Sequence, residues 1–203
     1  MPRIIIARNT SDSWNWSKNY ILYTLQEKNM KIAVVNGSPR KGNTAAAIDA
    51  LLKGIGSSHE TDIIDLNKLA ISPCKGCGAC ECYKGCVAKD DSNAAVDRLV
   101  AADMIVFGTP VYWWGMTAQL KTLIDKCYCR GAQLKGKKIG IIIVGGATTD
   151  DEEYSLIARQ FACMGEYLNW NILFTKAYSA SEANELAANA DAMNELQELG
   201  SSI

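Results

Sequence analysis

The stretch KIAVVNGSPRKGNT, residues 31–44, decides the fold of this 203-residue chain. Its first six residues form an apolar run, which predicts a buried β-strand. A loop of small and polar residues follows, and from about Thr44 apolar residues recur at helical spacing. A buried strand, a tight loop and a helix in succession are typical of the first unit of a parallel α/β sheet.

The rest of the chain repeats this alternation. We expect further strands at about 61–66, 104–107, 139–144 and 172–174, with helices between them and a last helix from near Ser181. Strands that are continuous apolar runs indicate a parallel sheet covered by helices on both faces. The sequence thus predicts a doubly wound sheet of five strands, whose ligands bind at the carboxyl ends of the strands.

Residues 1–29 differ in character and are interpreted as an N-terminal extension of a domain at 30–203; the alternative is an arm that docks on the domain or on a partner subunit. A net charge of −1 predicts no general attraction to nucleic acid or to acidic membranes. No apolar run approaches the roughly 20 residues that span a bilayer. Without an export signal, the eight cysteines are expected to be reduced thiols or ligands in the cytoplasm.

The loop after the first strand is a candidate phosphate site. Backbone N–H groups at a helix start, aided by the helix dipole, attract anions. Ser38, Asn43 and Thr44 add short hydrogen-bond donors, and Arg40 adds positive charge. The G-K-[ST] ending of a Walker loop is absent. We therefore expect a monophosphate here, the alternative being an ordinary turn of small residues.

The loop after the third strand carries three consecutive aromatic residues, Tyr112, Trp113 and Trp114. Aromatic surface at the mouth of a parallel sheet predicts a flat ligand that covers it, such as an isoalloxazine ring. Pro110 stiffens this turn, and Gly115 lets the backbone approach a ligand closely. The alternative is that the aromatic residues close the end of the sheet or form a subunit interface.

A cysteine-rich loop after the second strand is a candidate metal centre. Cys74, Cys77, Cys80 and Cys86 have the spacing C-x2-C-x2-C-x5-C, and Cys82 is a spare thiol. The first three match the spacing of bacterial ferredoxins, whereas the fourth follows after five residues instead of three. Zinc could also accept four thiolates. An iron–sulfur cluster, zinc and no metal at all therefore remain open from the residues alone.

These loops together resemble a known family. Residues 37–44 (GSPRKGNT) and 109–116 (TPVYWWGM), followed by Leu120-Lys121 and Asp125-Lys126, resemble the NADPH-dependent FMN reductase superfamily of flavodoxin-like proteins. The cysteine spacing is similar to that of its iron–sulfur flavoproteins. The resemblance covers residues 30 to about 200, and one departure is Lys126, where arginine is commoner.

The resemblance implies a sheet of order 2-1-3-4-5, bound FMN, and homodimers or homotetramers in which one subunit completes the site of its neighbour. The residues implied to contact FMN are Ser38, Arg40, Gly42, Asn43, Thr44, Pro110, Val111, Tyr112, Trp113, Trp114, Gly115, Gly145 and Gly146. The residues implied to hold a [4Fe–4S] cluster are Cys74, Cys77, Cys80 and Cys86.

The expected activity is that of an FMN-dependent oxidoreductase that passes electrons between FMN and the cluster. NAD(P)H or a ferredoxin-like carrier would exchange electrons with it, and no catalytic side chain is expected because the flavin carries the chemistry. The alternatives are a cluster-free NAD(P)H-dependent FMN or quinone reductase, a flavodoxin-like carrier or thiol-based sensor, and a zinc-stapled binding module.

Three smaller expectations concern residues outside these loops. Cys127, Cys129 and Cys163 are expected to be small buried hydrophobic residues. The acidic run Asp150–Glu153 is expected to begin a helix, with Thr148 or Thr149 as its cap.

Overall fold

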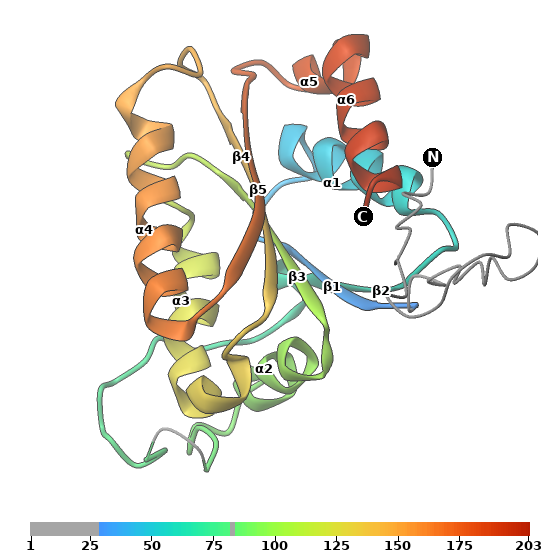
Figure 1. Cartoon of the computed structure of the whole chain (residues 1–203). Coiled ribbons are helices and arrows are strands. Elements are labelled where there is room, and N and C mark those ends of the chain that lie inside the picture. Colours follow the sequence, from blue (N-terminus) through green and yellow to red (C-terminus); the bar gives the residue numbers. More distant parts are fainter. Residues whose placement is uncertain (1–28, 82–83) are drawn as a thin grey trace, which may run out of the picture.

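The computed structural model describes residues 29–81 and 84–203, so the predictions for residues 1–28 and for Cys82 lie outside the described residues. Figure 1 shows one sheet with helices on both of its faces. All of its strand pairs are parallel, and their order is β2-β1-β3-β4-β5, which confirms the predicted topology. The strands are β1 (Lys31–Asn36), β2 (Glu60–Asp65), β3 (Met104–Pro110), β4 (Lys138–Gly145) and β5 (Asn171–Ser179).

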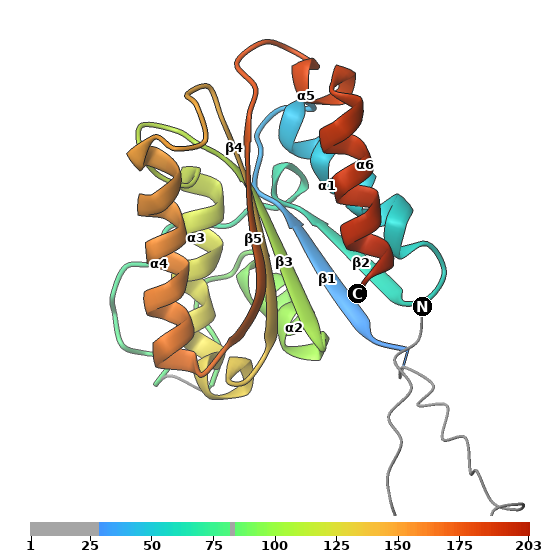
Figure 2. The same cartoon turned by 45° about the horizontal axis from the view of Figure 1, so that its top comes forward.

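The helices form two layers, which Figure 2 shows on opposite sides of the sheet. One layer contains α1 (Asn43–Ile55), α5 (Glu185–Ala188) and α6 (Ala190–Ser201); the other contains α2 (Ser92–Ala101), α3 (Ala118–Lys126) and α4 (Glu152–Leu168). Two short 3-10 helices, η1 (Leu66–Lys68) and η2 (Cys127–Leu134), follow β2 and α3. Because side chains alternate along a strand, each central strand contributes to both apolar cores.

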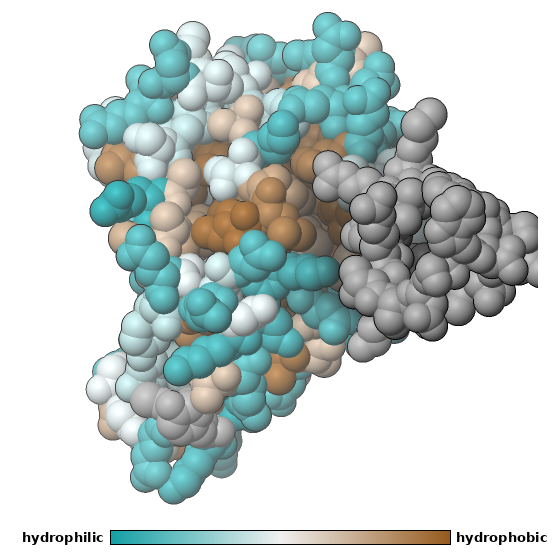
Figure 3. Space-filling model, in the orientation of Figure 1, coloured by the Kyte–Doolittle hydropathy of each residue, from teal (hydrophilic) through white to brown (hydrophobic). Residues whose placement is uncertain are grey.

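Three boundaries differ from those expected, and the first is that of β3, which extends to Pro110 instead of ending at Phe107. The last strand extends to Ser179 instead of ending near Phe174. It is an edge strand whose residues are mostly half-buried or exposed, and Figure 3 shows apolar surface over it, where Leu173 is 45% exposed. The last helix does not begin near Ser181: a short helix begins at Glu185, and Asn189 then caps α6 by accepting the Ala192 N–H.

The parallel strands bring three of the predicted site loops to one edge of the sheet. Asn36 lies beside Gly108, and Pro110 lies beside Val144, so the loops after β1, β3 and β4 leave the sheet next to one another. The cysteine loop is defined here as residues 69–91, and its described residues extend away from the sheet beside α2 at the lower left of Figure 1. Among the described residues, no helix combines the length and the apolar character needed to cross a bilayer.

Candidate functional site

The phosphate loop, residues 37–44, is bonded tightly to the neighbouring strand and helix. The Gly37 N–H donates to the Gly108 carbonyl at 2.8 Å, and the Thr117 hydroxyl donates to the Gly37 carbonyl at 2.7 Å. A Cβ on residue 37 would lie 2.8 Å from the Gly108 oxygen, so only glycine fits this approach. Thr117 also caps α3 by accepting the Leu120 N–H. One buried hydroxyl therefore joins the first loop to the start of α3.

The start of α1 leaves its backbone donors available. Gly42 is its N-cap and offers no side-chain acceptor to the first N–H groups of the helix. Ser38 is 5% exposed, and its hydroxyl bonds the backbone of Arg40 as both donor and acceptor. Thr44 is buried, whereas the Arg40 side chain is exposed. An uncapped helix start inside a glycine-containing loop suits an anion.

The side chain of Asn43 hydrogen-bonds the segment that follows β5. Its Nδ2 donates to the carbonyls of Ala180 and Glu182 at 3.3 and 2.8 Å, and its Oδ1 accepts the Leu186 N–H at 3.1 Å. Residues about 140 positions away in the sequence satisfy this amide, so the spacing of Asn43 within its own loop could not reveal the contact. Asn43 braces the phosphate loop against the segment that follows β5.

The loop after β3, called the aromatic loop here because it contains Tyr112, Trp113 and Trp114, forms a two-residue hairpin turn. Tyr112 and Gly115 exchange backbone hydrogen bonds of 2.8 and 3.1 Å, and the two tryptophans between them both have positive φ, at 50° and 58°. This type I′ geometry normally favours Asn or Gly, and bulky side chains adopt it at a cost of about 1–3 kcal/mol each. Trp113 is 91% exposed and meets Trp114 edge to face. The strained backbone of Trp113 and Trp114 therefore places two exposed aromatic side chains at this edge of the sheet.

The loop after β4 forms the third wall of the candidate site. Gly145 is buried, and a Cβ there would overlap Glu153 Oε1 and lie 2.8 Å from both the Tyr154 hydroxyl and Val111 Cγ2. Gly146 is exposed. Pro110, the last residue of β3, lies beside Val144 of β4, and the Val111 N–H donates to the Val144 carbonyl at 2.8 Å. A glycine at 145 is therefore required by packing.

Glu153 and Tyr154 were not predicted as part of this wall. Glu153 Oε1 is buried and has no hydrogen-bond partner among the described residues. Tyr154 donates to the Ala147 carbonyl at 2.8 Å, and burial together with the Glu153 charge raises the pKa of its hydroxyl to about 12. The acidic run does begin α4, but Asp151 is the cap instead of Thr148 or Thr149. The sequence could not show which of four successive acidic residues would turn inward.

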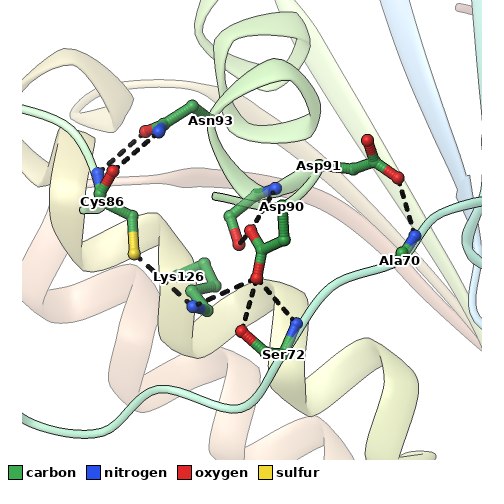
Figure 4. A network of polar contacts seen from close by, with 8 residues as sticks. Ala70, Ser72, Cys86, Asp90, Asp91, Asn93 and Lys126 are labelled. Carbon is green, nitrogen blue, oxygen red and sulfur yellow. Dashed lines mark hydrogen bonds and ion pairs between the residues drawn. The ribbon is translucent and has the colours of Figure 1, made fainter. Parts of the chain in front are cut away.

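The cysteine loop is held at its two ends. The Ala70 N–H donates to the Asp91 carboxylate at 2.7 Å, and the Asp91 N–H donates to the Ala70 carbonyl at 3.1 Å. Next to this pair, the Asp90 carboxylate accepts hydrogen bonds from the N–H and hydroxyl groups of Ser72 and Ser92. Figure 4 shows these contacts where the two ends of the loop meet. Half-buried carboxylates at the base thus fix where the loop starts and ends.

The four predicted metal ligands are not equally fixed. Cys74 and Cys77 are exposed, whereas Cys80 and Cys86 are partly buried against the core beneath α2 and α3. Asn93 holds the Cys86 backbone through two hydrogen bonds of 2.8 Å, one to its N–H and one to its carbonyl. In the part of the chain that the structure describes, no three potential metal ligands are arranged as a metal site.

The chemistry of the loop nevertheless suits a metal cluster. Four thiols are the donor set of a [4Fe–4S] cluster, and glycines 76, 78 and 85 have positive φ values of 64°, 69° and 93°. Such turns let a short chain fold around one centre. The ends of the loop and the Cys86 backbone are already held by hydrogen bonds.

The remaining thiols follow the prediction in part. Cys129 is buried, as expected, and burial raises the pKa of its thiol, while a hydrogen bond with the Cys86 backbone and the charge of Arg130 oppose this rise. Cys127 is partly buried. The prediction for Cys163 is wrong, because its side chain is exposed on α4. Cys163 lies on the face opposite to Phe161 in the helical repeat, whereas Phe161 faces the core.

A five-stranded parallel sheet of this order, with its loops gathered at the carboxyl edge, defines a flavodoxin-like protein. Residues 30–185 match the family model of the NADPH-dependent FMN reductases, and the chain belongs to that family. It is therefore a flavin-dependent oxidoreductase whose cofactor is FMN.

Individual relatives agree with this family. An iron–sulfur flavoprotein of Archaeoglobus fulgidus is 32% identical over 142 residues, which is 68% of this chain and 70% of that protein. One of Methanosarcina thermophila is 33% identical over 63% of this chain and 69% of its own length. Among solved structures, an NAD(P)H:quinone oxidoreductase of Methanothermobacter marburgensis aligns with a TM-score of 0.68 at 16% identity, over 86% of this chain and 96% of that one, and supports the fold alone.

Proposed function

We propose that this protein is an iron–sulfur flavoprotein that passes electrons between FMN and a [4Fe–4S] cluster on Cys74, Cys77, Cys80 and Cys86. The observation that carries the proposal is the cysteine loop: its four thiols have a cluster-like spacing, and Cys86 is already fixed against the core. The names of the Archaeoglobus and Methanosarcina relatives support the same reading.

The phosphate loop is proposed to hold the FMN phosphate. The N–H groups at the start of α1 would bind it, with Gly42 giving backbone access and Ser38, Thr44 and Arg40 lining the loop. The side chain of Asn43 would keep this loop in place through its bonds to the segment after β5. Phosphate binding would need little rearrangement of this loop, because the loop is already bonded to β3 and α3.

The other two walls are proposed to position the ring. The backbone of 110–115 and the aromatic side chains of Tyr112, Trp113 and Trp114 would border the isoalloxazine, while Gly145 and Gly146 would leave room on the side of β4. When bound, FMN accepts a hydride and returns electrons one at a time, and a cluster accepts single electrons. The side chains of this chain would bind, orient and shield those groups and would not themselves be oxidised.

We further propose the partners and the setting that this chemistry needs. NAD(P)H would stack on the flavin, and a ferredoxin-like protein or a small molecule would exchange electrons with the cluster. A homodimer or homotetramer would complete each site, and free thiols in this number fit the reducing cytoplasm. No role in binding nucleic acid or membranes is proposed.

A cluster-free NAD(P)H-dependent reductase is the second candidate. It is favoured by the exposure of Cys74 and Cys77 and by the separation of the thiols among the described residues. In that case the cysteine loop would present thiols to solvent, and the FMN site would act alone.

Purification without oxygen tests both candidates. We expect about one FMN per chain, about four iron and four sulfide, and a visible spectrum with both flavin and cluster absorption. Cys77→Ser should lose the iron and keep its FMN. FMN with NADPH oxidation but without iron would identify the cluster-free reductase. Zinc without flavin would contradict both candidates and would favour a zinc-stapled module.

A further inference from the structure

Lys126, the last residue of α3, carries its positive charge inside the protein. Only 3% of its side chain is exposed, and an ammonium is costly to bury unless it is paired. Its Nζ donates a hydrogen bond to Cys86 Sγ at 3.5 Å, and the nearest Asp90 carboxylate oxygen is 3.9 Å away. Figure 4 shows the ammonium between this sulfur and this carboxylate. A proposed cluster ligand therefore has a buried cation in direct contact with its sulfur.

Asp90 supports this arrangement by remaining an anion. Burial opposes its ionisation, but the hydrogen bonds from Ser72 and Ser92 outweigh burial and hold the pKa of Asp90 below its usual range. Two of these bonds, from the N–H groups of Ser72 and Ser92, measure 2.9 Å each. Asp90 thus balances the charge of Lys126 without taking its hydrogen bond, which goes to the sulfur.

The contact between Lys126 and Cys86 is fixed from two rigid elements. Asn93, in the first turn of α2, holds the Cys86 backbone, and Lys126 reaches the sulfur from the end of α3. Helices α2 and α3 pack on the same core. The geometry does not depend on the exposed part of the cysteine loop, so it should persist when Cys74 and Cys77 move toward Cys86.

Resting on the cluster of the proposed function, we propose that Lys126 is a positioning residue that holds the Cys86 sulfur and raises the reduction potential of the cluster bound there. Hydrogen bonds to a ligand sulfur and positive charge near a cluster both stabilise its reduced, more negative form. Because the site is half-buried, a charge in contact with the sulfur is weakly screened. Asp90 opposes the effect only in part, since it lies on the far side of the ammonium and its own charge is shared among four donors.

The test is a redox titration of the anaerobically purified protein, followed by the electron paramagnetic resonance signal of the reduced cluster. Lys126→Met should make reduction of the cluster about tenfold less favourable, which is about 59 mV for a one-electron couple. Lys126→Arg keeps the charge and the donors and should restore most of the shift. FMN content should stay the same in both variants.

Lys121→Met provides the matched control on the same helix. Lys121 is half-exposed and paired with Asp125, so its loss removes one lysine charge without touching a sulfur. We expect the cluster potential of this variant to match that of the wild type. An equal shift in Lys121→Met and Lys126→Met would mean that net charge alone sets the potential and would overturn the assignment.

The remaining outcomes are also decisive. An iron-loaded Lys126→Met protein with the wild-type potential would overturn the role of Lys126 and leave the iron–sulfur flavoprotein intact. If Lys126→Met binds no iron, retention of iron by Lys126→Arg supports the positioning role, and loss in both variants refutes it. A wild-type protein without iron would refute the proposed function and this inference together.

Discussion

The phosphate loop and the cysteine loop both follow strands of one sheet, but they are braced to different degrees. The phosphate loop is bonded to β3, to α3 and to the segment after β5, over separations of about 70 to 140 residues. The cysteine loop is held at its ends and at Cys86, while Cys74 and Cys77 lie exposed between these points. The phosphate loop is thus hydrogen-bonded to three other parts of the fold, whereas the cysteine loop is held only at its ends and at Cys86 among the described residues.

This difference has a physical cause. A phosphate is bound by backbone N–H groups whose directions must be set in advance, since each costs free energy if it is misaligned. A metal cluster supplies strong bonds of its own, so binding it can provide the free energy that orders its loop. We therefore expect changes in the phosphate loop and changes in the cysteine loop to have separate effects on stability, hydrogen exchange and cofactor content.

The largest contrast should appear in amide hydrogen exchange. The Gly37 N–H is buried and bonded to a central strand, and we expect it to exchange about a thousandfold or more slowly than an unprotected amide. No N–H between Pro73 and Cys80 donates to another described residue, so these amides should exchange near their intrinsic rates in iron-free protein. Mass spectrometry of iron-free and reconstituted protein measures both segments.

Reconstitution with iron and sulfide should then slow exchange in residues 73–80 and leave residue 37 unchanged. Equal protection of the two loops from hydrogen exchange in iron-free protein would contradict the proposed difference between them, because the cysteine loop would then be preformed. Protection gained in the cysteine loop on adding FMN alone would also contradict it.

Asn43→Ala should give the next largest effect, on the phosphate loop only. The substitution removes two donated hydrogen bonds and leaves the Leu186 N–H without its partner. We expect a loss of about 2–3 kcal/mol in the free energy of unfolding, measured with urea, and weaker FMN binding. The control Asn194→Ala, at an exposed position of α6, should change stability by less than about 0.5 kcal/mol. Loss of iron together with FMN in Asn43→Ala would show that the loops are coupled.

The contrast also explains what could be predicted from the sequence. Strands β1, β3 and β4 are continuous apolar runs, so their position, direction and buried faces follow from local pattern. The edge strand β5 is half-exposed and mixes apolar with polar residues, and its length was underestimated for that reason. Glycine-containing loops directly after buried strands were recognisable as candidate site loops because their place in the fold is fixed by the strands.

The contacts that brace each site were not predictable. Asn43 reaches Glu182, and Lys126 reaches Cys86, across 139 and 40 positions of sequence. Lys126 was noted only as a departure from the arginine commoner in the family, and nothing local indicates that its side chain is buried. Residue type and spacing identify groups able to bind a ligand, whereas the partners that orient them depend on how the layers pack.

Gly85→Ala should have a smaller effect that is confined to the cysteine loop. Residue 85 has φ of 93°, and a Cβ there would lie 2.7 Å from Arg130 Nη1 and 2.9 Å from Asn93 Oδ1. We expect a loss of about 1–2 kcal/mol in unfolding free energy and reduced iron retention, because Asn93 must shift away from Cys86. Gly131→Ala, where a Cβ meets no atom within 4 Å, is the matched control. Unchanged iron content together with loss of FMN in Gly85→Ala would show that residue 85 supports the FMN site instead of the cysteine loop.

The smallest effect should be a pH dependence contributed by Asp90 at the base of the cysteine loop. Its folded-state pKa is lowered, because hydrogen bonds from Ser72 and Ser92 outweigh the opposing effect of burial. A lowered pKa means that the stabilisation is fully present above the unfolded-state value of about 4 and is lost as the pH falls below it. Urea unfolding should therefore show a fall in unfolding free energy between pH 5 and pH 2.5 that is about 1 kcal/mol smaller in Asp90→Asn than in the wild type.

The acid sensitivity contributed by Asp62, whose pKa is lowered chiefly by its hydrogen bond with Arg98, should remain in that variant. Identical acid sensitivity of Asp90→Asn and the wild type would show that this carboxylate does not hold the base of the loop, which would then depend on the hydrogen bonds between Ala70 and Asp91.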